Sequence, residues 1–354
     1  MSPMKYSIKV WVFVGNMGWF WSNGMMRIWI LAALALIALG CATGKPVPEP
    51  GTAPTPGAPA PQTTEPRPAV TLDLDAPILL GDLVSTLADT TGGSLVVMNG
   101  LEYVSIPPRN WKKTPFERVV KDVASPANLK VEENPYYVFL YFPGYEALES
   151  VSLEGRLDPA FAAITASVGF GYRTKVFEAL AFMSSSLGIT LLADQVIGDA
   201  QLGALNLAES PLDVCLAALL KSARVPAEAF DVESTPEYVF LHAKSNTPRE
   251  TLLNPLELTA AQTEFLNQKV TAVLPSTPIN ISRVGKLGDA LPALSRQIGV
   301  EMTAQPGLGQ LPVEPGVFRD VKVRTLLDLM IRQWPVAEFG YRVEGNGIVI
   351  QRRP

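Results

Sequence analysis

Few residues of this chain have the types and spacing that enzyme or metal chemistry requires. The single histidine, His242, has no neighbouring cysteine or histidine with which to hold a metal ion. No nucleophile elbow is present to supply a serine for it to activate. Gly307-Leu308-Gly309 offers two glycines of a phosphate-binding loop without the third. The sequence therefore predicts no metal, no cofactor and no enzymatic activity.

Two acids and a cysteine have structural interpretations that compete with chemical ones. Asp73 and Asp75 would share a face of a strand, as a hydrolase's acid pair requires, but we expect Asp75 to cap a helix starting at Pro77. Cys215 lies in an apolar helical stretch, where a small core residue is expected rather than a reactive thiol. The formal net charge of −5 provides no basic surface, so no nucleic-acid partner is predicted.

An apolar run near the N-terminus ends at a cysteine. Residues 28–40 are uncharged and too short for a membrane span of about 20 residues, but they have the length of a signal peptide. Gly40-Cys41 at the end of this run resembles the lipobox of bacterial lipoproteins. The resemblance implies cleavage before Cys41, diacylation of its thiol and, because Ala42 follows rather than an aspartate, an outer-membrane location facing the periplasm.

The leader itself is unusual. We interpret residues 1–40 as the signal peptide, with translation starting at Met25 or Met26, because the preceding residues are aromatic-rich and contain only two lysines. A signal anchor that spans both apolar stretches is the alternative. Cleavage would remove three basic residues and no acid, which changes the formal charge from −5 to 26 − 34 = −8.

A proline-rich segment follows the cysteine. Residues 42–68 contain nine prolines, interspersed with threonine, alanine and glycine. Such a composition cannot bury a core and favours extended polyproline-like chain of about 3 Å per residue. We therefore interpret residues 41–69 as a lipidated cysteine followed by a tether.

The rest of the chain contains one pattern three times. Residues 114–142 and 210–243 are similar, with Thr114-Pro115 matched by Ser210-Pro211 at a helix start, where the hydroxyl is expected to cap. Each copy also has an earlier helix of apolar spacing three and four that ends at a glycine. These glycines are Gly92, Gly188 and Gly299. Each unit ends in a β-hairpin, so the predicted order is β-α-β-β-α-β-β in an α+β fold.

This order and these motifs resemble the STN module, the short N-terminal domain shared by secretins (where it is the N0-like domain) and TonB-dependent receptors. Three such modules are predicted in tandem, at residues 70–142, 166–243 and 278–354. The linkers are residues 143–165 and 244–277, the latter with a helix at Ala260–Leu274. The leading strand of the third module is expected at Ile279–Ser282.

The resemblance implies a role in protein–protein interaction. The aromatic hairpin strands are the candidate partner-binding surface, either as a docking edge or, alternatively, as strands buried on both faces. We expect a non-enzymatic envelope lipoprotein that is a scaffold in a secretin-type secretion or type IV pilus system, or in a TonB-linked outer-membrane assembly. The alternative is an envelope ligand sensor or peptidoglycan-binding lipoprotein. Besides Cys41 for lipidation, the candidate residues are Tyr137, Phe139, Tyr141, Tyr238 and Phe240.

Overall fold

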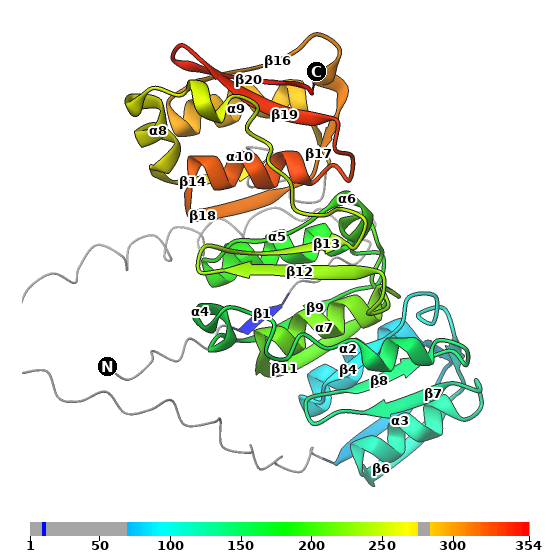
Figure 1. The fold of residues 1–354 in the computed structure, drawn as a ribbon. Coiled ribbons are helices and arrows are strands. Elements are labelled where there is room, and N and C mark those ends of the chain that lie inside the picture. The colour runs from blue at the N-terminus through cyan, green and yellow to red at the C-terminus, as the bar shows by residue number, and fades with distance from the viewer. Residues whose placement is uncertain (1–8, 12–68, 275–283, 354) are drawn as a thin grey trace, which may run out of the picture. The chain divides into compact units, whose positions relative to one another are not determined.

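Three successive segments each contain two main α-helices packed between β-strands (Figure 1). The structure is a computed structural model, which describes residues 9–11, 69–274 and 284–353. All of the described residues belong to one compact unit. The predicted class, α+β with three tandem β-α-β-β-α-β-β modules, is confirmed.

The first repeat shows the pairing pattern that the others share. Val70–Leu74 pairs antiparallel with Arg109–Thr114, and Leu95–Val97 pairs parallel with Val138–Tyr141. Lys130–Glu133 and Val138–Tyr141 form a hairpin. Two short strands pair beside the first helix. In chain order the elements are β2 (Val70–Leu74), β3 (Ile78–Leu79), α2 (Leu80–Thr91), β4 (Leu95–Val97), β5 (Ser105–Ile106), β6 (Arg109–Thr114), α3 (Phe116–Ala124), β7 (Lys130–Glu133) and β8 (Val138–Tyr141).

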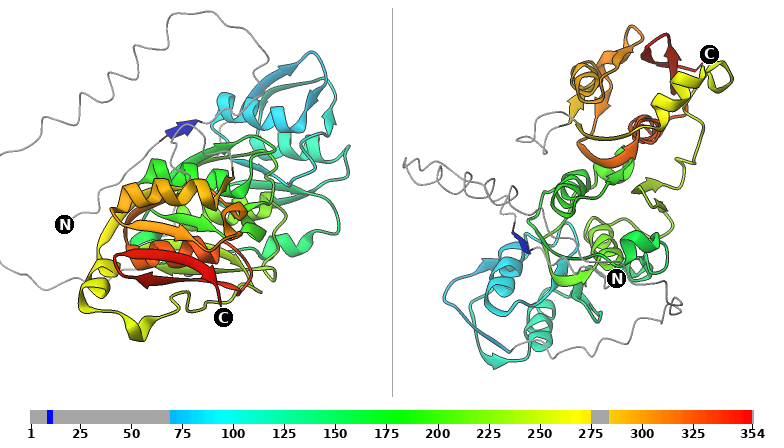
Figure 2. Two further views of the ribbon diagram at one scale, coloured as in Figure 1. Left: turned by 90° about the horizontal axis from the view of Figure 1, so that it is seen from above. Right: turned by 90° about the vertical axis from the view of Figure 1, so that its left-hand side faces the viewer.

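The second and third repeats have the same pairing. The second consists of β9 (Thr165–Phe170), α5 (Val176–Leu187), β10 (Leu191–Ala193), α6 (Gln195–Gly198), β11 (Leu205–Pro211), α7 (Leu212–Ser222), β12 (Phe230–Thr235) and β13 (Tyr238–Ala243). The third consists of β14 (Lys269–Leu274), β15 (Gly285–Lys286), α9 (Leu287–Ile298), β16 (Glu301–Ala304), η3 (Leu308–Gln310), β17 (Pro312–Val313), β18 (Gly316–Lys322), α10 (Val323–Arg332), β19 (Phe339–Glu344) and β20 (Gly347–Arg352). Both views of Figure 2 show the repeats in chain order, from cyan through green to orange and red.

The helix ends explain part of this regularity. The first helix of every repeat stops at a glycine with positive φ, namely Gly92 at 63°, Gly188 at 69° and Gly299 at 72°. A left-handed residue at this position ends a helix, and glycine adopts it without a steric penalty. The predicted glycine stops are therefore confirmed.

The predicted hydroxyl caps of the second helices are wrong. Pro115 and Pro211 occupy the N-cap positions, and neither helix start has a side-chain cap. Thr114 ends β6, and Ser210 belongs to β11 and donates its hydroxyl to the carbonyl of Ala208. Strand leads directly into helix at these points, so the hydroxyls lie one residue too early to cap.

The third repeat begins earlier than its sequence pattern indicates. The predicted helix over Ala260–Leu274 ends at Asn267 as α8 (Ala260–Asn267), and β14 follows. Val270, Ala272 and Leu274 alternate with polar or less buried residues, so this stretch has the period of a strand and pairs with β18. The strand predicted at 279–282 lies outside the described residues, and β14 has the leading place in the sheet.

The segments between repeats are packed rather than free. Residues 143–165 contain η1 (Glu146–Ser150) and α4 (Pro159–Ala162), and the segment after the second repeat contains η2 (Pro255–Glu257). Apolar side chains from these segments are buried in the cores. They are Leu148, Val151, Leu153, Leu157, Phe161, Leu252 and Leu266.

The repeats do not have three separate cores. One apolar cluster extends from Val70 in the first repeat to Leu241 in the second, and another fills the third repeat. Leu192 and Phe240 of the second repeat belong to the third repeat's cluster. The first two repeats also share a six-stranded sheet of order β1-β9-β11-β4-β8-β7, in which β1 is Lys9–Trp11.

Candidate functional site at the repeat junctions

The predicted partner-binding residues lie inside the molecule. β8 lies between β4 and β7, and β13 lies between β10 and β12, so neither strand is an edge. The side chains of Tyr137, Phe139, Tyr141 and Phe240 are buried, and that of Tyr238 is half-buried. The docking-edge interpretation of these strands is therefore wrong, and the alternative of strands buried on both faces is correct.

These aromatic residues nevertheless contact another module, which is the next repeat of the same chain. Lys221, the tenth residue of α7, lies with its ammonium 5.9 Å from the ring centre of Tyr137 and 5.7 Å from that of Phe139. Its Nζ donates to both carboxylate oxygens of Glu132 on β7, at 2.6 and 2.8 Å. The lysine is only 2 % exposed, so this carboxylate supplies the partner that a buried ammonium requires.

The second junction has the same contacts. Arg332, the tenth residue of α10, donates to Glu233 on β12 at 2.6 Å and lies 4.8 Å from the ring centre of Phe240. Burial alone would raise the pKa of Glu233, but hydrogen bonds from Arg332 and Tyr238 outweigh it and lower that pKa. In both hairpins the acid stands opposite the phenylalanine, Glu132 with Phe139 and Glu233 with Phe240.

Backbone contacts repeat as well. The hydroxyl of Ser94, just before β4, accepts the N–H of Ala208 on β11 at 2.9 Å, and the hydroxyl of Thr190, just before β10, accepts the N–H of Arg319 on β18 at 2.9 Å. The residue after each basic side chain accepts a further backbone N–H from the preceding repeat. The N–H of Asn99 donates to the carbonyl of Ser222 at 2.8 Å, and the N–H of Gln195 donates to the carbonyl of Gln333 at 2.9 Å.

One position distinguishes the two junctions. Gly203 stands two residues before β11, and a Cβ there would lie 2.2 Å from the carbonyl oxygen of Val97. The close approach allows Val97 N–H to donate to Ala204 at 2.9 Å, and β11 pairs with β4. Glu314 stands two residues before β18, and β18 does not join the sheet of β10.

The Glu314 side chain is buried without a hydrogen bond. Its carboxyl packs on α6, where a Cβ on Gly198 would lie 2.3 Å from Oε2. Both carboxyl oxygens are buried and find no hydrogen-bond partner among the described residues. Burial, followed by the charges of Asp199 and Asp194, raises the pKa of Glu314 to about 8 against the opposing effect of Lys175. This raised pKa favours the protonated form of the buried carboxyl group at neutral pH.

A polar network surrounds this joint. Asp194 is fully buried and accepts the N–H groups of Ile197 at 3.0 Å and Ala243 at 2.9 Å, together with the amide of Asn246 at 2.9 Å. Asn246 also donates to the carbonyl of Arg332 at 2.9 Å. These bonds fix the start of the segment after β13 against the end of α10.

The remaining sequence candidates have structural roles or lie outside the described residues. Cys215 is a buried free cysteine, and burial raises the pKa of its thiol to about 12. Both observations agree with the expected role as a core residue. His242 is buried and stacks on Phe240 with ring centres 5.5 Å apart. Asp75 caps no helix, because α2 starts at Leu80 with Leu79 as its N-cap. Cys41 lies outside the described residues.

Over the described ranges, no group of three or more His, Cys, Asp or Glu is arranged to hold a metal ion. Within the same ranges, no helix has the length and apolarity to cross a membrane.

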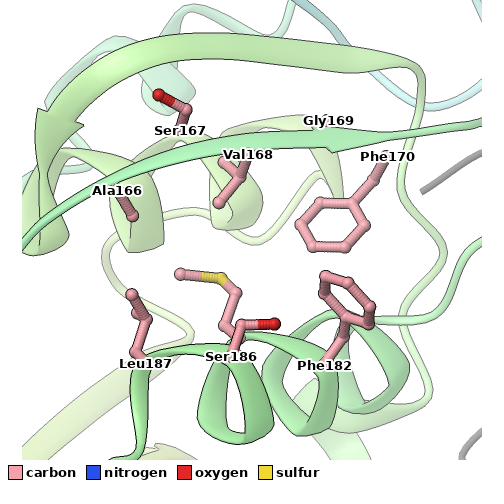
Figure 3. A pocket seen from close by; sticks show the side chains of 9 residues that line it. Ala166, Ser167, Val168, Gly169, Phe170, Phe182, Ser186 and Leu187 are labelled. Carbon is pink, nitrogen blue, oxygen red and sulfur yellow. The ribbon is translucent and has the colours of Figure 1, made fainter. Parts of the chain in front are cut away.

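An apolar hollow lies between β9 and α5 (Figure 3). Phe170 and Phe182 meet edge to face with ring centres 6.2 Å apart, and Val168 points from the strand towards the helix. The lining residues are Ala166, Ser167, Val168, Gly169, Phe170, Phe182, Met183, Ser186 and Leu187.

The junction residues Glu132, Lys221, Glu233 and Arg332 were missed by sequence reasoning. A signal for them exists, because a basic residue ends the apolar second helix in two repeats and an acid stands before two hairpin turns. Comparison with known proteins adds no relative: no family model, no curated protein and no solved structure matches this chain.

Proposed function

We propose that this chain is a non-enzymatic envelope lipoprotein that works as a protein–protein interaction scaffold. The observation that carries the proposal is that one module binds the next twice, through a hydroxyl that accepts a backbone N–H, a buried ion pair and a ring beneath the cation. A fold that uses its surface in this way is suited to holding further modules of an assembly.

The N-terminal sequence supports a membrane location. Cys41 would carry the lipid, residues 42–68 would be the tether, and the repeats would face the periplasm from the outer membrane. The tether's length at about 3 Å per residue would separate the modules from the lipid headgroups by several tens of ångströms.

The class of partner follows from the resemblance to STN modules. A secretin-type secretion or type IV pilus system, or a TonB-linked outer-membrane assembly, is the proposed setting. Once the short elements β3, β5, α6, β15, η3 and β17 are set aside, every repeat has the order β-α-β-β-α-β-β. This supports the proposal, because it is the order that the resemblance implies.

Two measurements on cells test the proposal. The mass of the N-terminal peptide and membrane fractionation should show a lipidated chain in the wild type and a soluble or uncleaved chain in Cys41→Ala, with Ala42→Ser as the matched control. Photo-crosslinkers at exposed positions on the repeats should then capture a secretin or another outer-membrane assembly component. A chain without lipid, or crosslinks only to cell-wall glycan, would contradict the scaffold role and favour the peptidoglycan-binding alternative.

A further inference from the structure

The outer sheet of the third repeat corresponds to the sheets that form the two junctions. It consists of β16, β20 and β19, and α9 and α10 lie between it and the pair β14 and β18 (Figure 1). The corresponding strands are β4, β8 and β7 in the first repeat and β10, β13 and β12 in the second. In those two repeats the hairpin of this sheet contacts the next module through its acid and its ring.

The strand register identifies the equivalent positions on the third sheet. Glu233 and Phe240 are the third pair from the two-residue turn of their hairpin, and Arg342 and Val349 are the third pair from the turn of theirs. Val349 also pairs with the parallel strand β16, as Phe240 pairs with β10. Val349 therefore has the place of the junction phenylalanine, and Arg342 has the place of the junction glutamate.

The charge at this place is reversed. A guanidinium stands where the other two repeats have a carboxylate, and the Arg342 side chain is 36 % exposed. Its Nη2 lies 2.8 Å from the carboxylate of Glu257 and its Nε lies 3.9 Å from that of Glu344, and both acids are more than half exposed. Ion pairs this exposed contribute little, so a carboxylate from a partner can compete for the guanidinium.

The positions around Arg342 are open. Val349 is half-buried and Thr303, its neighbour on β16, is exposed. Phe139 and Phe240, at the place of Val349, are fully buried. The third sheet thus keeps the strand arrangement of a junction, but its outer face is accessible and its central charge is positive.

The chain has no acid that matches this face. Lys221 and Arg332 are the tenth residues from the starts of α7 and α10, and the tenth residue from the start of α3 is Ser125, which is exposed. A second copy docked through its first repeat would place this neutral hydroxyl against Arg342. A module with an acid at the same position would place a carboxylate there, so charge complementarity selects such a module.

We propose that the outer face of β16, β20 and β19 is the docking site for a module of the same fold in a partner envelope protein, and that this module has an aspartate or glutamate at the tenth position of its second helix. Its carboxylate pairs with Arg342 in the way that Lys221 pairs with Glu132, with the two signs exchanged. A lysine or arginine at that position would be repelled. The site names the partner of the proposed scaffold and rests on that function.

Full chains with a charge at position 125 are the probes, because α3 then presents the charge that a partner would present. The acidic probe is Ser125→Glu with Arg342→Glu, and the basic probe is Ser125→Lys. In both probes the charges at positions 125 and 342 have the same sign, which disfavours association of the probe with itself. Each probe has a fluorophore and is mixed with unlabelled wild type or Arg342→Glu in sedimentation velocity experiments.

The expected result is an exchange of preference. The acidic probe should bind wild type about tenfold more tightly than it binds Arg342→Glu, and the basic probe should show the opposite order. Arg296→Glu makes the same change of charge on α9 of the same repeat and should bind the acidic probe as wild type does. Circular dichroism shows whether each variant is folded, and Arg342→Gln, which removes the charge without reversing it, should give an intermediate affinity.

Equal binding of the acidic probe to wild type and Arg342→Glu, or binding to neither, would overturn the docking site. Association of wild type with itself as strong as with the acidic probe would also overturn it, because a second copy would then be the occupant. None of these measurements requires lipid. The expected order in a chain without lipid on Cys41 would keep the docking site and reject the anchoring, whereas a lipidated chain without that order would reject the docking site alone.

Discussion

At the first junction β11 of the second repeat joins the sheet of the first repeat, whereas at the second junction β18 stays outside the sheet of β10. The two junctions share the ion pair, the ring beneath the cation and the hydroxyl contact. They differ at the position two residues before the strand, which is Gly203 before β11 and Glu314 before β18. The difference indicates that a residue without a side chain lets β11 approach β4 closely enough to pair, while the remaining contacts hold the modules together at both junctions.

The largest expected effect is from making the first junction like the second. Gly203→Glu would place a side chain against the carbonyl of Val97 and separate β11 from β4. We expect a loss of about 4 kcal/mol in unfolding free energy, from overpacking, lost strand pairing and a buried carboxyl. Urea denaturation measures the loss. Gly309→Ala is the control, because its Cβ would meet nothing closer than 3.7 Å. Equal effects of the two variants would contradict the close-approach argument.

Removing the buried cation should have the next largest effect. Lys221→Met leaves Glu132 without its partner at an enclosed site and should cost about 3 kcal/mol. Arg332→Met should cost less, because the Glu233 side chain is 27 % exposed against 18 % for Glu132. Lys175→Met, which breaks a more exposed pair with Asp199, should cost about 0.5 kcal/mol. Chemical denaturation of the three variants would refute the ranking if Lys175→Met cost as much as Lys221→Met.

Glu314 gives the second junction a dependence on pH. Its folded pKa of about 8 lies above its ordinary value of 4.5, so the folded state keeps a proton that the unfolded state releases. Stability from this group is therefore lost as pH rises through the folded pKa, by about 2 kcal/mol between pH 6 and pH 8. Glu314→Gln should remove this decline.

Denaturation of both proteins at pH 6, 7 and 8 measures the difference. Asp328, whose pKa burial raises to about 6, remains in both and contributes equally. Parallel stability curves for wild type and Glu314→Gln would show that Glu314 is ionised in the folded protein.

The smallest effect should be the same at both junctions. Ser94→Ala and Thr190→Val each remove the hydroxyl that accepts a backbone N–H, and each should cost about 1 kcal/mol. Hydrogen exchange at the amides of Ala208 and Arg319 should accelerate in the corresponding variant only. A large cost at one junction and none at the other would break the equivalence.

Local pattern was sufficient to predict most elements of the repeats, but not β14. The glycine stops at Gly92, Gly188 and Gly299 and the three hairpins follow from residues a few positions apart. β14 was missed because its alternating residues directly follow a capped helix, so the apolar positions were assigned to a continuation of that helix. The strand pairing partner that distinguishes the two cases lies far away in sequence.

The junctions depend on contacts between distant residues, and composition does not reveal them. The aromatic hairpin residues were correctly singled out as unusual, but their partner was expected in another protein. Phe139 instead contacts Lys221 and Phe240 contacts Arg332, and those cations lie on helices that sequence patterns describe only as apolar. Alignment of the repeats locates these residues but gives no information on which module contacts which.

The equivalence of the two junctions is tested most directly by a pair of double-mutant cycles, Glu132→Gln with Lys221→Met and Glu233→Gln with Arg332→Met, measured by urea denaturation. Both cycles should give a favourable coupling energy of about 1 kcal/mol or more, larger for Glu132 with Lys221 because that pair is less exposed. Additive effects at either junction would contradict the account that one set of contacts joins all three repeats.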